Sequence, residues 1–137
     1  MSSVYYIEPE VAGELGDGTV MNSSVHPPVV KKLELCLSGW LGDDLLECYP
    51  CFIVTERVAN ELKNTVQDNI FFEKIIVTQS DEFNEIYPGK PLPNFYWMKF
   101  INGKEIFLSE DQRLAVSEHI MNTLNNFNIS NAIIEKV

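Results

Sequence analysis

The residues best suited to chemistry lie in the stretch SGWLGDDLLE, residues 38–47, which brings Asp43, Asp44 and Glu47 close together. Clustered carboxylates could bind a metal ion, act as a general acid and base, or contact a basic protein. Adjacent acids on an extended backbone point to opposite faces, and the stretch lacks the alternating acids of a calcium-binding loop. We therefore expect a solvated turn or a partner-facing surface here, and no metal site.

Cys48 and Cys51 form a C-x-x-C motif, and Cys36 lies nearby. Such a motif could be a redox pair or half of a zinc site. A zinc site needs a second pair of ligands, and the sequence offers none. A redox motif would open a helix, whereas the residues that follow Cys51 are typical of a strand. We expect free cysteines that pack as small apolar side chains.

The two histidines are the remaining candidates for acid–base catalysis. His26 precedes two prolines in a loop, and His119 lies beside Glu118 in the first turn of an expected helix. The chain has no nucleophile elbow, Walker loop or dinucleotide-binding fingerprint. We expect no catalytic residue and no cofactor.

The charge of the chain restricts its partners. The 137 residues contain 20 acids and 10 bases, so the formal net charge is −10. Nucleic acids and anionic membranes bind basic surfaces, so neither is an expected partner, whereas a basic protein is. The chain has an odd number of cysteines, no apolar leader and no long apolar run. These features predict a cytoplasmic protein.

Two similar segments predict how the chain folds. FIVTERVANELKN (residues 52–64) and LAVSEHIMNTLNN (residues 114–126) both run from an apolar strand through Thr55 or Ser117 into an amphipathic helix. An apolar strand follows each helix, at residues 71–77 and 131–137. We expect one α+β domain, residues 1–137, with a mixed sheet and two main helices. Residues 1–30 form a loop-rich N-terminal arm, and residues 31–137 form a core with two strand–helix–strand units.

An aromatic strand is expected at NFYWMKF, residues 94–100. Asn102-Gly103 follows it and predicts a β-hairpin with KEIFLS, residues 104–109. Alternation puts Tyr96 and Trp97 on opposite faces of the strand. Core packing on both faces is the commoner arrangement, but a face without a helix would leave one of these rings as a binding anchor.

The order of these motifs resembles a known family. The chain contains VYYIEPEVAGELGDGT, WLGDDLL, P-x-FIVTE-x-VA-x-x-L, LPNFYWMKF and LAVSE-x-x-M-x-x-L, in that order. This pattern resembles the immunity proteins of bacterial polymorphic toxin systems, closest to the immunity protein 43 family and its relative, immunity protein 11. The resemblance implies a non-catalytic protein that binds a cognate toxin domain and blocks its active site or substrate access.

On this interpretation, WLGDDLLE is part of the surface that binds the toxin. Trp40 would be an aromatic anchor, and Asp43, Asp44 and Glu47 would form an acidic contact rim for a basic, nuclease-like toxin. Tyr96 and Trp97 are further candidates for the interface. Two alternatives remain open at this point: an adaptor domain of a larger assembly that uses the same surface, and a small acid–base hydrolase that uses His119.

Overall fold

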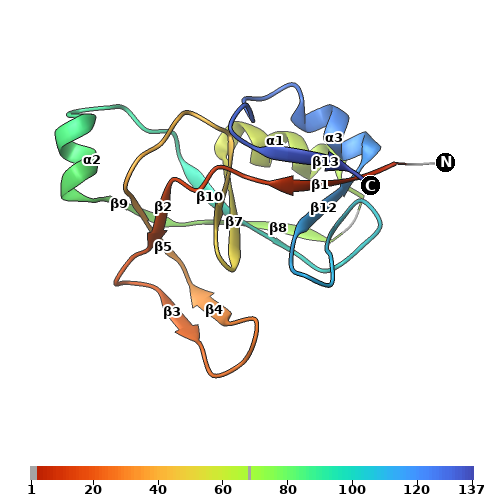
Figure 1. Cartoon of the computed structure of the whole chain (residues 1–137), viewed down its shortest axis with the longest axis horizontal. Coiled ribbons are helices and arrows are strands. Elements are labelled where there is room, and N and C mark those ends of the chain that lie inside the picture. The colour runs from red at the N-terminus through yellow and green to blue at the C-terminus, as the bar shows by residue number, and fades with distance from the viewer. Residues whose placement is uncertain (1–2, 68) are drawn as a thin grey trace.

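Two strand–helix–strand units build two four-stranded sheets in the computed structural model, which describes residues 3–67 and 69–137 (Figure 1). The first unit consists of β7 (Cys51–Thr55), α1 (Glu56–Thr65) and β8 (Ile70–Lys74). Its sheet has the order β6-β7-β10-β8, with β6 (Leu45–Cys48) at one edge and β10 (Phe95–Phe100) between the strands of the unit. Because β10 is antiparallel to both neighbours, β7 and β8 run parallel.

The second unit repeats this topology with β12 (Leu114–Ser117), α3 (Glu118–Leu124) and β13 (Ile133–Lys136). Here β1 (Val4–Glu8) lies between the strands of the unit, and β11 (Ile106–Leu108) pairs at the far side, giving the order β11-β12-β1-β13. The two similar sequence segments therefore adopt similar folds, and the predicted α+β class with two strand–helix–strand units is confirmed.

Two smaller sheets complete the fold. β2 (Gly13–Leu15), β5 (Glu34–Leu37) and β9 (Ile76–Gln79) form a mixed sheet, in which β5 and β9 are parallel. β3 (Val20–Asn22) and β4 (Val29–Lys32) form a two-stranded hairpin that projects away from the rest of the chain (Figure 1). A mixed sheet is expected for the core from the sequence. Within the described residues, this small sheet is mixed, and the strand pairs in the other three sheets are all antiparallel.

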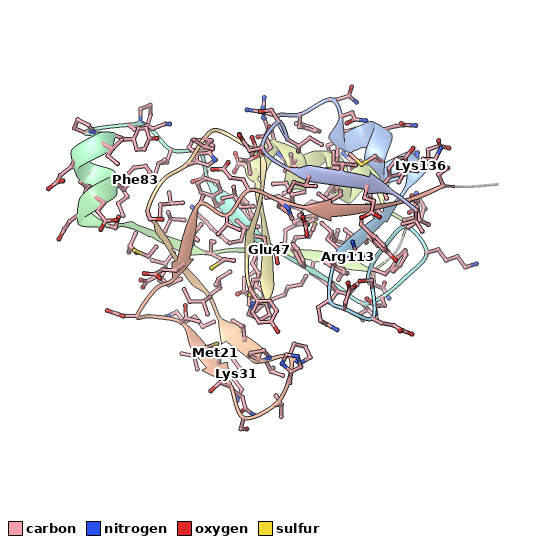
Figure 2. All side chains as sticks on the ribbon, in the orientation of Figure 1. Met21, Lys31, Glu47, Phe83, Arg113 and Lys136 are labelled. Carbon is pink, nitrogen blue, oxygen red and sulfur yellow. The ribbon has the colours of Figure 1, made fainter. Side chains whose placement is uncertain are left out.

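The sheet β6-β7-β10-β8 separates two hydrophobic cores. In β7, Phe52 and Val54 join the core that contains α1, α3 and the β11-β12-β1-β13 sheet, whereas Cys51 and Ile53 join the core beneath β2-β5-β9. The short helix α2 (Asp81–Ile86) closes the second core with Phe83, which points inward and is fully buried (Figure 2). Burying a large apolar side chain of this kind stabilises a fold by about 1.5–3 kcal/mol.

The predicted aromatic β-hairpin is wrong. β10 forms its hydrogen bonds with β7 on one side and β8 on the other, so no edge of it is left for residues 104–109. β11 pairs instead with β12, and the Asn102 carboxamide oxygen accepts a hydrogen bond from the backbone N–H of Leu108. A local turn signal is here overridden by pairing with strands distant in sequence.

Two further expectations need correction. The predicted buried strand at residues 71–77 is divided at Ile75 between β8 and β9, which belong to different sheets, and Phe71 is exposed. The N-terminal arm, predicted as loop-rich over residues 1–30, also contains β2, β3 and the start of β4. These strands have three or four residues each, too few for a period to be read from the sequence.

No helix within the described ranges is both long and apolar enough to cross a bilayer.

Candidate functional site

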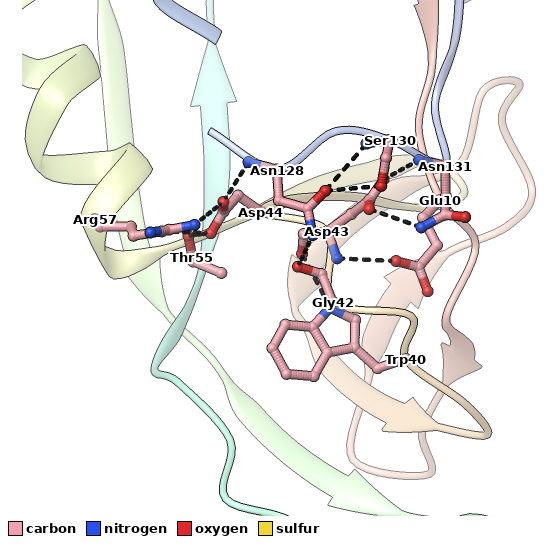
Figure 3. Close-up of polar contacts among 10 residues, drawn as sticks. All are labelled: Glu10, Trp40, Gly42, Asp43, Asp44, Thr55, Arg57, Asn128, Ser130 and Asn131. Carbon is pink, nitrogen blue, oxygen red and sulfur yellow. Dashed lines mark hydrogen bonds and ion pairs between the residues drawn. The ribbon is translucent and has the colours of Figure 1, made fainter. Parts of the chain in front are cut away.

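Asp43 lies in the interior and links three segments of the chain (Figure 3). Its carboxylate accepts two hydrogen bonds from Asn131, from the backbone nitrogen at 2.9 Å and from Nδ2 at 2.8 Å. Its backbone nitrogen donates to Oε1 of Glu10 at 3.3 Å, and its backbone oxygen accepts from Nε1 of Trp40 at 2.9 Å. Asp43 therefore joins the loop before β6 to the segment that leads into β13 and to the end of β1.

Asp44 is equally enclosed, with 3% of its surface exposed, and it accepts four hydrogen bonds. Oδ1 accepts from Oγ1 of Thr55 at 2.7 Å and from Nε of Arg57 at 2.9 Å. Oδ2 accepts from Nη2 of Arg57 at 2.5 Å and from the backbone nitrogen of Asn128 at 2.8 Å. We call Asp43, Asp44 and these partners the aspartate clamp.

The electrostatics of Asp44 follow from these contacts. Burial acts to raise the pKa of the carboxyl group, but hydrogen bonds from Arg57, Thr55 and Asn128 more than offset it, so the pKa is lowered. Thr55 occupies the N-cap position of α1 as expected, but its side chain accepts no capping hydrogen bond, and its hydroxyl donates to Asp44. Ser117 occupies the matching position before α3 and does accept a hydrogen bond from the backbone nitrogen of Ile120.

The prediction that Asp43 and Asp44 belong to an acidic contact rim is therefore wrong. Both residues are buried, and their carboxylates accept hydrogen bonds from within the chain. Trp40 is not an exposed anchor either: it is 9% exposed and packs edge-on against Phe95 with 5.5 Å between ring centroids. The partners that bury the acids, Asn128 and Asn131, lie more than 80 residues away in sequence. Across the described ranges, no group of three metal-ligating side chains is present.

Glu47 lies elsewhere, in an open groove of about 920 Å³ between β1, β2, the β6–β7 turn and the start of β13. Glu8 and Glu14 line it with Glu47, and exposed apolar side chains form its rim: Val11, Leu41, Tyr49 and Ile133. None of the described residues that line it is basic. We call this feature the glutamate groove; it contains one of the expected contact residues, Glu47, and three acids that the sequence analysis did not single out, Glu8, Glu10 and Glu14.

The groove holds carboxylates that lack partners. Glu8, Glu14 and Glu47 form no ion pair or side-chain hydrogen bond with any residue in ranges 3–67 and 69–137. Burial, together with the nearby charge of Glu8, raises the pKa of Glu47. Burial also raises the pKa of Glu10, against the effect of hydrogen bonds from the backbone nitrogens of Leu41 and Asp43. The groove is therefore a site of unneutralised negative charge.

Tyr96 and Trp97 are half-buried on opposite faces of β10, as alternation predicts, and neither lines the glutamate groove. The Tyr96 hydroxyl donates to Oε2 of Glu56 at 3.3 Å. The Lys99 ammonium lies 4.3 Å from the centroid of the Trp97 ring. The structure thus does not bring the six expected contact residues together into one surface.

The two histidines and the pair Cys48 and Cys51 are the other residues whose chemistry suits catalysis or redox reactions. In the part of the chain that the structure describes, neither His26 nor His119 has a side-chain hydrogen bond or an ion pair, so the acid–imidazole couple that the hydrolase alternative requires is not formed. Cys48 and Cys51 face each other across the β6–β7 turn as buried free thiols. Burial is the largest cause that raises their pKa values, to about 11 and about 12.

Replacing Asp44 by Asn tests the clamp. The amide cannot accept all four hydrogen bonds, so we expect the free energy of unfolding in urea to fall by about 2–4 kcal/mol at pH 7. The lowered pKa means that the native state favours the ionised form, so this stabilisation is complete above the ordinary value of 3.8 and is lost as pH falls through the folded-state pKa. The exposed control Asp17→Asn should change stability by less than about 0.5 kcal/mol. An equal effect of the two substitutions would contradict the clamp.

Replacing Glu47 by Gln tests the unpaired charge. The pKa of the Glu47 carboxyl group is raised in the folded chain, so the ionised form destabilises the native state. This destabilisation is fully present at a pH above the folded-state pKa and is absent at a pH below the ordinary value of 4.5. The substitution should raise the melting temperature by roughly 2 °C at pH 7, and this gain should vanish under acid conditions. Glu85→Gln, at an exposed position of α2, is the matched control and should leave the melting temperature unchanged.

Alkylation with iodoacetamide tests the thiols. At pH 8 the folded chain should gain at most one adduct quickly, at the half-buried Cys36, because Cys48 and Cys51 are buried and protonated. In urea all three should react, as mass spectrometry of the intact chain and its peptides would measure. Fast modification of Cys48 or Cys51 in the folded chain would refute the assignment.

Comparison of the chain with protein-family models, with curated proteins and with solved structures finds no match in any of the three. The resemblance to immunity proteins stays a prediction.

Proposed function

We propose that this chain is a non-catalytic immunity protein, which binds a cognate toxin domain and blocks its active site or its access to substrate. The observation that carries the proposal is the glutamate groove, where the carboxylates of Glu8, Glu14 and Glu47 have no cation among the described residues. Exposed apolar side chains border these charges, as in interfaces where a few buried anchors supply affinity and charges supply orientation.

The chemistry of the groove fits a basic partner. A lysine or arginine side chain that enters it would neutralise carboxylates that are now unpaired, and the formal charge of −10 would speed the encounter. A nuclease toxin is one such partner, because its phosphate-binding cleft is basic and carboxylates can occupy the positions of phosphates. Docking of this kind needs no bond to be made or broken in either protein.

The two alternatives have less support. The hydrolase alternative lacks an acid–imidazole couple in the described part of the chain. The adaptor alternative calls for a long apolar edge strand for pairing with other chains. The edge strand β8 has five residues and the edge strand β13 has four, and two residues of each are charged. Glu135 and Lys136 at the edge formed by β13 oppose uncontrolled pairing.

A growth assay tests the function. The chain is expressed in bacteria together with the toxic domain encoded beside its gene, and we expect the wild-type chain to restore growth. The double substitution Glu8→Lys with Glu14→Lys, at exposed positions of the groove, should abolish protection and slow association of the purified proteins by about tenfold or more. Substitution of Asp43 or Asp44 is unsuitable, because it would disrupt the clamp.

The matched control is Glu85→Lys with Glu110→Lys, which changes the net charge equally at exposed positions outside the groove. It should retain protection. Equal loss in both double variants would mean that only overall charge matters and would overturn the assignment to the groove. Absence of binding by the wild-type chain would overturn the proposed function itself.

A further inference from the structure

The hairpin formed by β3 and β4 exposes apolar side chains to solvent, although Val30 of β4 packs against the second core. It comprises residues 18–32, and its two strands pair only with each other. Four of its apolar side chains are strongly exposed: Val20, Met21, Val25 and Val29. A lone two-stranded hairpin is marginally stable in water, and contiguous exposed apolar groups indicate an interaction surface. These four side chains are therefore left uncovered in the single chain.

Its charge is opposite to that of the rest of the molecule. Residues 18–32 include two of the ten basic residues, Lys31 and Lys32, and none of the twenty acids. Both lysines are exposed, and neither forms an ion pair or hydrogen bond with its side chain within the described ranges. A hairpin with apolar side chains and two free cations complements a groove with an apolar rim and free carboxylates.

The base of the hairpin is fixed to the body. Oγ1 of Thr19 donates to the backbone oxygen of Glu34 at 3.1 Å and accepts from the backbone nitrogen of Glu34 at 3.0 Å. The backbone nitrogen of Gly16 donates to the same oxygen of Glu34 at 2.8 Å. These hydrogen bonds fix the position at which the hairpin leaves the body.

The hairpin and the glutamate groove are close in the chain. β2, which lines the groove, leads directly into β3, and Figure 2 shows Met21 and Lys31 on the projection below the labelled Glu47. Each copy thus carries a donor hairpin and an acceptor groove in one region of its surface. Two copies related by a two-fold axis can then dock hairpin into groove twice, which doubles the contact area and closes the assembly.

We propose that the β3–β4 hairpin of one chain occupies the glutamate groove of a second copy, in a reciprocal two-fold dimer. Lys31 and Lys32 pair with carboxylates of Glu8, Glu14 and Glu47 and offset two of these three charges, and the valines and Met21 cover the apolar rim. One consequence rests on the proposed function: a toxin that uses the same groove displaces the hairpin, so the dimer is the free form of the chain.

Charge exchange between two variants of the full chain tests the dimer. The hairpin variant carries Lys31→Glu with Lys32→Glu, and the groove variant carries Glu8→Lys with Glu14→Lys. Sedimentation velocity at roughly 10–500 µM, a range suited to weak association, should give a dimer for the wild type and a monomer for each variant alone. An equimolar mixture of the two variants should give a dimer again, because both hairpin–groove contacts then join opposite charges.

The restored dimer in the mixture also demonstrates that both variants fold, and Glu85→Lys with Glu110→Lys should dimerise like the wild type. A monomeric wild type throughout this range overturns the proposal. Variants that still dimerise alone, or a mixture that stays monomeric beside a dimeric wild type, overturn it as well. No toxin is present in these measurements, so their failure would leave the proposed function standing, and failure of the growth assay would leave the dimer standing.

Discussion

The burial of Asp44 is the interaction on which the rest of the arrangement depends. A carboxylate removed from water is costly unless hydrogen bonds replace its hydration, and here Thr55, Arg57 and Asn128 supply four. These donors come from the junction of β7 with α1 and from the segment between α3 and β13. The carboxylate therefore ties the two strand–helix–strand units together.

Asp43 also shapes the glutamate groove, although it does not line it. Asp43 holds Asn131 beside the loop that contains Leu41, and Asn131 and Leu41 both line the groove. Glu10 bridges the same loop through the backbone nitrogens of Leu41 and Asp43, so its carboxylate is occupied. The acids near residue 43 thus position the walls, and a separate set of acids, which includes Glu47, supplies the free negative charge.

Local patterns in the sequence predict the elements better than they predict the site. The period of the apolar residues and the Thr or Ser before each helix locate α1 and α3, because these signals act within a few residues. The pairing of β10 and the burial of Asp43 and Asp44 depend on partners such as Asn131, 88 residues beyond Asp43, which no local pattern indicates. A signal for the groove does exist: the first 30 residues contain four acids and no lysine or arginine.

Unfavourable features that a fold retains are candidates for the places where it interacts. The chain retains two such features: a half-buried, unpaired carboxylate at Glu47 and an uncovered apolar hairpin with free lysines at residues 18–32. The two features are complementary. The lysines of the hairpin could pair with the carboxylates of the groove, and the apolar side chains of the hairpin could cover the apolar rim. Overall charge would attract a basic protein to any part of this chain, whereas the groove combines free carboxylates with an apolar rim whose burial would add binding energy.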